Sequence, residues 1–197
     1  MDNDRLLAMR YQRPEYIPVS VSILPATWAR YREELDALVA RHPVIFGAGP
    51  HISDGNYDLA QGTYVAGEHV DAWGCVWKNI RHGMEAMVVS HPVPTREAVH
   101  TLRPPSKVLG QLPHSFMWLR LADLRGFDQI MLDFAEEPPE LQMLIDIVLQ
   151  HNLRELEVML ANVQDEPIYF GDDLGMQTSL AISPAKWRQY MKPCYAA

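Results

Sequence analysis

Cysteine is scarce in this chain, with two residues in a length of 197. So few cysteines exclude a disulfide-stapled scaffold, and we expect Cys75 and Cys194 to be reduced, buried side chains. No apolar run approaches the ~20 residues that a membrane-spanning helix requires. Residues 1–5 are acidic and lack the basic and apolar segments of a signal peptide. These absences predict a cytoplasmic protein that is not embedded in a membrane.

Basic residues are also in the minority, since 17 Lys and Arg face 25 Asp and Glu and the net charge is −8. Such a charge argues against a nucleic-acid partner, which usually needs a basic face. The sequence has no glycine-rich dinucleotide or phosphate loop, no Gly-x-Ser-x-Gly and no His-Glu-x-x-His. Its eight histidines show no metal-ligand spacing, so no metal site is predicted.

A folded core is expected, because 48% of the residues are hydrophobic and 21% are charged. Apolar periodicity and capping signals predict helices over 4–10, 25–41, 95–103 and 115–124, from 138 to about 156, and from 184 onward. Alternation and β-branched content predict strands over 16–24, 69–77, 106–112 and 168–171. Strands that alternate with helices favour a parallel sheet with crossover helices.

The segment 168–195 carries the most information. It reads as a short buried strand, then a loop with the adjacent carboxylates Asp172 and Asp173, then a helix that begins at Ser183-Pro184. Serine before a proline is a strong helix start, because serine caps the helix and proline suits its first position. This order is typical of a catalytic strand-to-helix loop in an α/β barrel.

Several segments occur together in a recognisable order. They are Asp-Ala-Trp-Gly-Cys-Val-Trp at 71–77, the stretch 126–140 with Gly-Phe, Leu-Asp and Pro-Pro-Glu, Gly-Asp-Asp-Leu-Gly at 171–175, Ile-Ser-Pro at 182–184 and Trp-Arg at 187–188. Residues 5–8 and 17–19 also fit. In these segments the chain resembles the uroporphyrinogen decarboxylase superfamily, which includes porphyrin decarboxylases and methyltransferases that work with corrinoid proteins and thiols. The resemblance runs over nearly the whole chain.

The resemblance implies an α/β fold of the (β/α)8 TIM-barrel type. Such barrels typically need ~250 residues. Residues 1–197 are therefore expected to form a single N-terminal portion of the barrel domain, with about the first four β/α units.

The activity that the resemblance implies is decarboxylation of a porphyrinogen, or methyl transfer with a corrinoid protein, on a small-molecule substrate. Two departures bear on the choice. Residues 18–29 lack the arginines that handle substrate carboxylates in the decarboxylases, and the chain has no His-x-Cys zinc motif. No cofactor is expected in this chain, and zinc and a corrinoid apply only if the full-length protein is a methyltransferase.

The alternative is a non-catalytic fragment or half-barrel that associates with itself or a partner through open strand edges. A homo-oligomer is expected in either case.

Asp71 and Asp172 are the predicted catalytic residues. By motif order, the resemblance puts Asp71 at the position of the decarboxylases' catalytic aspartate, where a carboxylate holds pyrrole N–H groups and stabilises a cationic intermediate. The alternative role for Asp71 is to stabilise the turn at Trp73-Gly74. Neighbours on an extended segment point to opposite sides, so only one of Asp172 and Asp173 faces the barrel mouth, and Asp172 is preferred.

Four further residues are predicted to bind substrate: Trp73, His114, Asp173 and Gln177. Trp73 suits the wall of an apolar pocket, and its alternative role is in the core. His114 follows the predicted strand 106–112, and its alternative is a structural hydrogen bond.

Overall fold

The computed structural model describes residues 3–19, 21–47, 56–58, 64–111, 115–162, 168 and 171–197. The contacts divide the chain into two compact units. The first comprises Met1–Glu68 and Lys78–Met87, and the second comprises His69–Trp77 and Val88–Ala197.

The first unit contains α1 (Asn3–Met9), α2 (Pro25–Ala40) and α3 (Pro43–Phe46). α2 begins with a proline in its first turn, where the missing N–H leaves no helical hydrogen bond unmade. The helix kinks at Arg32, whose φ of 44° is not helical. Arg32 Nη1 lies 3.0 Å from Asp58 Oδ1 in an exposed ion pair. The helices predicted over 4–10 and 25–41 are confirmed.

Three short strands form the sheet: β1 (Gly67–Val70), β2 (Val76–Asn79) and β3 (Met87–Ser90), in the order β1-β2-β3. The sheet is antiparallel. Each pair of consecutive strands is joined by a short turn, which antiparallel strands allow and parallel strands do not. The boundary between the two units crosses all three strands.

The predicted TIM-barrel fold is therefore wrong. The described residues hold one small antiparallel sheet among helices and no parallel β/α repeat. The ranges 16–24, 106–112 and 168–171 contain no strand where the structure describes them, and 69–77 forms the end of β1, a turn and the start of β2. Alternating apolar and polar residues form a strand only where a neighbouring strand completes the hydrogen bonds, and the sequence of one segment does not contain that neighbour.

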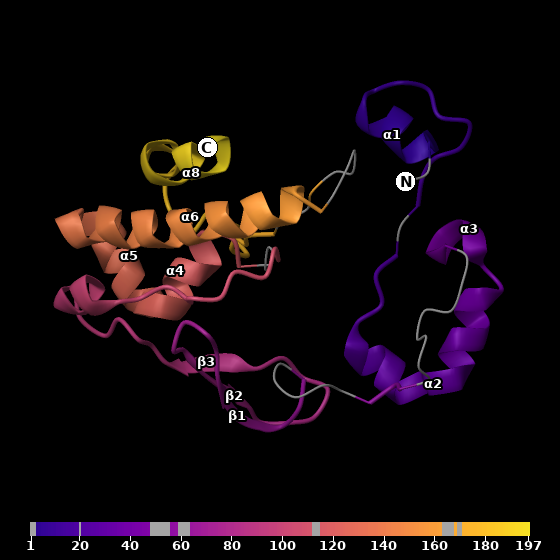
Figure 1. The fold of residues 1–197 in the computed structure, drawn as a ribbon, viewed down its shortest axis with the longest axis horizontal. Helices are drawn as coiled ribbons and strands as arrows, with labels where there is room; N and C mark the ends of the chain where they lie inside the picture. The colour runs from indigo at the N-terminus through magenta and orange to yellow at the C-terminus, as the bar shows by residue number, and fades with distance from the viewer. Residues whose placement is uncertain are drawn as a thin grey trace. The chain divides into compact units, whose positions relative to one another are not determined.

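The second unit is built around α6 (Pro139–Leu160), against which α4 (Trp118–Arg125) and α5 (Phe127–Glu136) pack (Figure 1). Apolar spacing predicts a buried stripe along this helix, formed by Leu141, Leu144, Ile145, Val148, Leu149 and Leu156. The first four are buried in the structure, and Leu149 and Leu156 are half-buried. A buried ion pair joins the other two helices: Arg125 Nε of α4 lies 2.8 Å from Asp133 Oδ2 of α5.

The C-terminal segment begins where the sequence predicts a helix. The Ser183 hydroxyl accepts a hydrogen bond from Lys186 N at 3.2 Å, which is the predicted cap. α7 (Pro184–Lys186) continues into a π-helical turn, η2 (Trp187–Met191), and then α8 (Lys192–Ala196). Met191 and Cys194 enter the same core as α4 and α6. The predicted helix 95–103 contains the 3₁₀ helix η1 (Glu97–Thr101).

No helix in the described part of the chain is both long and apolar enough to span a membrane.

Gly110 marks a close approach of the loop before α4 to α6. Its φ is +67°, and an added Cβ would lie 2.9 Å from Val158 Cγ1. We predict that Gly110→Ala lowers the free energy of unfolding by about 2 kcal/mol, because both the backbone conformation and the contact resist a side chain. Gly175→Ala is the control, since a Cβ there meets nothing within 4 Å. Urea unfolding measures both; equal stability of the two variants would contradict the close approach.

Candidate functional site

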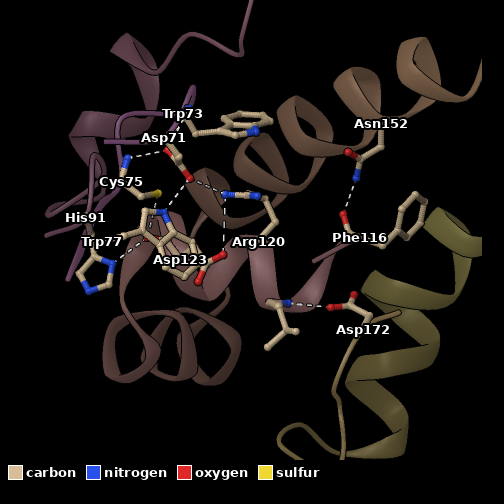
Figure 2. Close-up of polar contacts among 11 residues, drawn as sticks. Asp71, Trp73, Cys75, Trp77, His91, Phe116, Arg120, Asp123, Asn152 and Asp172 are labelled. Atoms are coloured by element: carbon tan, nitrogen blue, oxygen red, sulfur yellow. Dashed lines mark hydrogen bonds and ion pairs between the residues drawn. The ribbon is translucent and has the colours of Figure 1, made fainter. Parts of the chain in front are cut away.

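The β1–β2 turn is organised by one carboxylate. Asp71 Oδ1 accepts hydrogen bonds from the backbone N–H groups of Trp73 and Cys75, both at 2.9 Å. Its Oδ2 accepts from Trp77 Nε1 and from Arg120 Nη1 of α4, both at 3.0 Å (Figure 2). Both oxygens are therefore engaged within the chain. This is the turn-stabilising arrangement that the sequence offers as the alternative role for Asp71.

Arg120 joins two carboxylates. Its Nη1 lies 3.0 Å from Asp71 Oδ2 and 3.7 Å from Asp123 Oδ2 (Figure 2). The three side chains are only 11–19% exposed, so the charges are weakly hydrated. Asp123 Oδ2 is buried and has no hydrogen-bond partner in the described ranges of the chain. Burial, followed by the charges of Asp71 and Asp172, raises the pKa of Asp123 to about 6, although Arg120 and His91 oppose the shift.

The backbone carbonyl of Asp123 anchors two more side chains. His91 Nδ1 lies 2.7 Å from this oxygen, so that ring nitrogen carries the proton. Cys75 Sγ donates to the same oxygen at 3.4 Å. Burial, with help from the Asp71 charge, raises the pKa of the Cys75 thiol to about 12. A thiol in this state is a structural group and not a nucleophile.

Trp73 is buried between two other groups of this cluster. Its ring meets the His151 ring edge to face, with centroids 4.9 Å apart, and the Arg120 guanidinium lies 5.9 Å from its centroid. Trp73 is 8% exposed. Burial lowers the pKa of His151, whose Nδ1 is buried and has no hydrogen-bond partner among the described residues. The structure therefore places Trp73 in a packed polar cluster, which is the core role that the sequence offers as its alternative.

Asp172 caps α4 although it lies 53–55 residues later in the chain than the N–H groups that it accepts. Its carboxylate accepts the backbone N–H groups of Met117, Trp118 and Leu119, at 2.8 Å for the first and last. The Tyr195 hydroxyl donates to the same carboxylate at 2.6 Å. Burial and this carboxylate raise the pKa of Tyr195. A negative charge at a helix N-terminus is favourable, and α4 has no cap of its own.

Asp173 lies in a different environment from its neighbour. It lines a pocket of about 550 Å³ whose walls are the 173–181 loop and one face of α4 and α5. The polar residues of the lining are Asp173, Gln177, Thr178 and Ser179. The apolar ones are Trp118, Leu119, Ala122, Phe127, Met176 and Ala181. The loop is closed by the bridge between Gly175 and Leu180. A volume of this size suits a small-molecule ligand.

The predicted site residues thus fall into separate groups. Asp71 and Trp73 belong to the polar cluster, Asp172 caps α4, and Asp173 and Gln177 share the pocket. His114 lies outside the described residues. The two neighbouring carboxylates have different surroundings, since Asp172 accepts the N–H groups that begin α4 and Asp173 is among the residues that line the pocket.

Sequence reasoning did not identify Arg120, Asp123 and Phe127. Arg120 and Asp123 stand three residues apart on a predicted helix, a spacing that pairs opposite charges on one face. That signal was present in the sequence. Nothing local indicated that Phe127 would line a pocket with the 173–181 loop.

No group of three or more His, Cys, Asp or Glu side chains suited to a metal ion occurs among the residues with described positions. Comparison with family models, curated proteins and solved structures finds no match to the chain.

We predict that Asp172→Asn lowers the free energy of unfolding by about 2 kcal/mol, because the charged cap of α4 is lost. Asp146→Asn, at an exposed carboxylate of α6 that accepts a hydrogen bond from Gln142, is the control and should change stability by no more than about 0.5 kcal/mol. Urea unfolding at neutral pH measures both. An Asp172→Asn protein as stable as the control would refute the cap.

Asp123 makes stability depend on pH. Because its folded pKa of about 6 exceeds the ordinary 3.8, the folded chain binds more protons between these values. The stabilising contribution of protonated Asp123 is complete below about pH 4 and is lost as the pH rises through 6, for a total of at most about 3 kcal/mol.

We expect Asp123→Asn to abolish this decrease in the free energy of unfolding with rising pH. Urea unfolding between pH 4.5 and 7.5 measures it, at ~0.1 M salt so that screening is constant. Asp128→Asn, at an exposed carboxylate of α5, should keep the wild-type slope. Parallel pH profiles for wild type and Asp123→Asn would show that Asp123 ionises normally.

Proposed function

We propose that the pocket beside the 173–181 loop binds the substrate of a porphyrinogen decarboxylase, the activity that the resemblance to the uroporphyrinogen decarboxylase superfamily implies. One observation carries the proposal. A pocket of ligand size, about 550 Å³, brings the carboxylate residue Asp173 together with the aromatic residues Trp118 and Phe127 in one lining.

The lining matches the chemistry of such a substrate. A porphyrinogen presents pyrrole N–H donors and apolar ring faces. Asp173 supplies a carboxylate acceptor, and Trp118 and Phe127 supply aromatic surface. Their rings meet edge to face with centroids 6.4 Å apart. A fixed negative charge beside the pyrrole nitrogens would stabilise the positive charge that develops when a pyrrole ring is protonated.

Asp71 is less suited to this contact. Its two oxygens already accept four hydrogen bonds, so a pyrrole N–H would have to displace Arg120 or open the β1–β2 turn. We therefore assign the substrate contact to Asp173, and to Asp71 the positioning of the turn against α4.

The test is a titration of the full chain with uroporphyrinogen under anaerobic conditions, followed by tryptophan fluorescence, together with an assay for the decarboxylated product. We expect saturable binding that Asp173→Asn weakens at least tenfold, a loss of about 1.4 kcal/mol or more, because the acceptor is neutralised. Asp146→Asn, outside the pocket, should bind like wild type.

The same samples distinguish the alternative functions. Binding without turnover would favour the non-catalytic alternative. Turnover of methylcobalamin with a thiol, but not of porphyrinogen, would favour methyl transfer with a corrinoid protein. Absence of saturable binding in a folded, homogeneous sample would overturn the assignment of the pocket.

A further inference from the structure

A second cavity, in the first unit, is lined by basic side chains, whereas the pocket beside the 173–181 loop contains an acidic one. It has a volume of about 430 Å³ and lies between the first half of α2 and the β2–β3 turn. Its lining is Ala26, Ala29, Arg30, Arg81, His82, Gly83 and Met84. Three of these seven side chains are basic and none is acidic, on a chain whose net charge is −8.

The turn that carries two of the basic groups is fixed by a buried amide. Asn79 is 3% exposed, and its Nδ2 donates to the Met84 carbonyl at 2.5 Å. Its Oδ1 accepts from Arg81 N at 2.8 Å. One side chain thus holds both sides of the turn, and Gly83 supplies the φ of +83° that closes it. The positions of Arg81 and His82 are set by these bonds before any ligand arrives.

The segment before β1 holds the turn as well. Tyr64 O accepts from Gly83 N at 2.9 Å, and Ala66 N donates to His82 Nδ1 at 3.4 Å. Because Nδ1 accepts this bond, the proton of the imidazole is on Nε2, which remains a hydrogen-bond donor.

α2 approaches the turn through small residues. A Cβ on Gly83 would lie 3.7 Å from the Ala26 Cβ, so the turn and the helix are in van der Waals range there. Ala26 and Ala29 fill little space, which leaves the cavity open beneath Arg30. Arg30 itself lies 5.2 Å from the centre of the Tyr31 ring.

The basic groups of this cavity have no ion-pair partner among the residues with described positions. There, neither Arg30 nor Arg81 forms an ion pair. The neighbouring acidic side chain, Glu85, accepts a hydrogen bond from the Tyr64 hydroxyl at 3.4 Å. Two arginines and a histidine with a free-to-donate Nε2–H therefore line one cavity whose lining contains no acidic residue.

We infer that this cavity is a binding site for a small molecule that carries a phosphate group. Two guanidinium forks and an imidazole N–H offer more donors than one carboxylate accepts, whereas a phosphate presents three oxygens and a charge near −2. The inference is independent of the proposed decarboxylase, because no residue of the pocket beside the 173–181 loop takes part.

The probe is inorganic phosphate, titrated into the full chain by calorimetry at constant ionic strength, with succinate as the comparison anion. We expect saturable phosphate binding that Arg81→Gln weakens at least tenfold and Arg30→Gln at least threefold. Arg13→Gln, at an exposed arginine of the same unit outside this cavity, should change the affinity less than twofold. Far-UV circular dichroism and the melting temperature are recorded for each variant.

Three outcomes would overturn the inference: no saturable phosphate binding to the wild-type chain, an equal loss in Arg13→Gln, or tighter binding of succinate than of phosphate. If Arg81→Gln melts early, the result for Arg30→Gln decides, because Arg30 belongs to α2 and not to the turn.

Discussion

The structure of the second unit depends on the carboxylate of Asp172 at the N-terminus of α4. A helix leaves its first N–H groups without partners, and α4 has no capping side chain of its own. Asp172 supplies the missing acceptor from a distant part of the chain, and Tyr195 adds a fourth donor. This one interaction caps α4 and connects it to the C-terminal helix α8 through Tyr195. The next residue, Asp173, is among those that line the pocket.

The side chains of α4 lie in three different environments. Trp118, Leu119 and Ala122 line the pocket, Arg120 and Asp123 enter the polar cluster, and Arg125 pairs with Asp133 in the core. Charges in such places are costly unless each is met by a partner. Burial is the main reason why Asp123 keeps its proton to a higher pH, and Arg120, which lies closer to Asp71 than to Asp123, opposes that shift only in part. The cluster is built mainly to hold the β1–β2 turn.

The two cavities differ in the chemistry that they offer. One combines a carboxylate with aromatic surface and suits a ligand with N–H donors, whereas the lining of the other has basic but no acidic residues and suits an oxyanion. Most polar groups of each cavity belong to a loop that is fixed by internal hydrogen bonds, and Arg30 of α2 is the exception. The 173–181 loop is closed by the Gly175–Leu180 bridge, and the β2–β3 turn is held by Asn79.

The sequence by itself determined the elements whose signals are local. The α2 and α6 helices follow from prolines in their first turns and from the spacing of their apolar residues. The Ser183 cap follows from a side chain that accepts a hydrogen bond from the nearby backbone. Only the tertiary structure decided the sheet, since the segments 16–24 and 106–112 have strand-like patterns without a partner strand. The tertiary structure also decided which carboxylate caps α4. The donors to Asp172 belong to residues 117–119 and 195, and no local sequence pattern predicts contacts between segments so far apart in the chain.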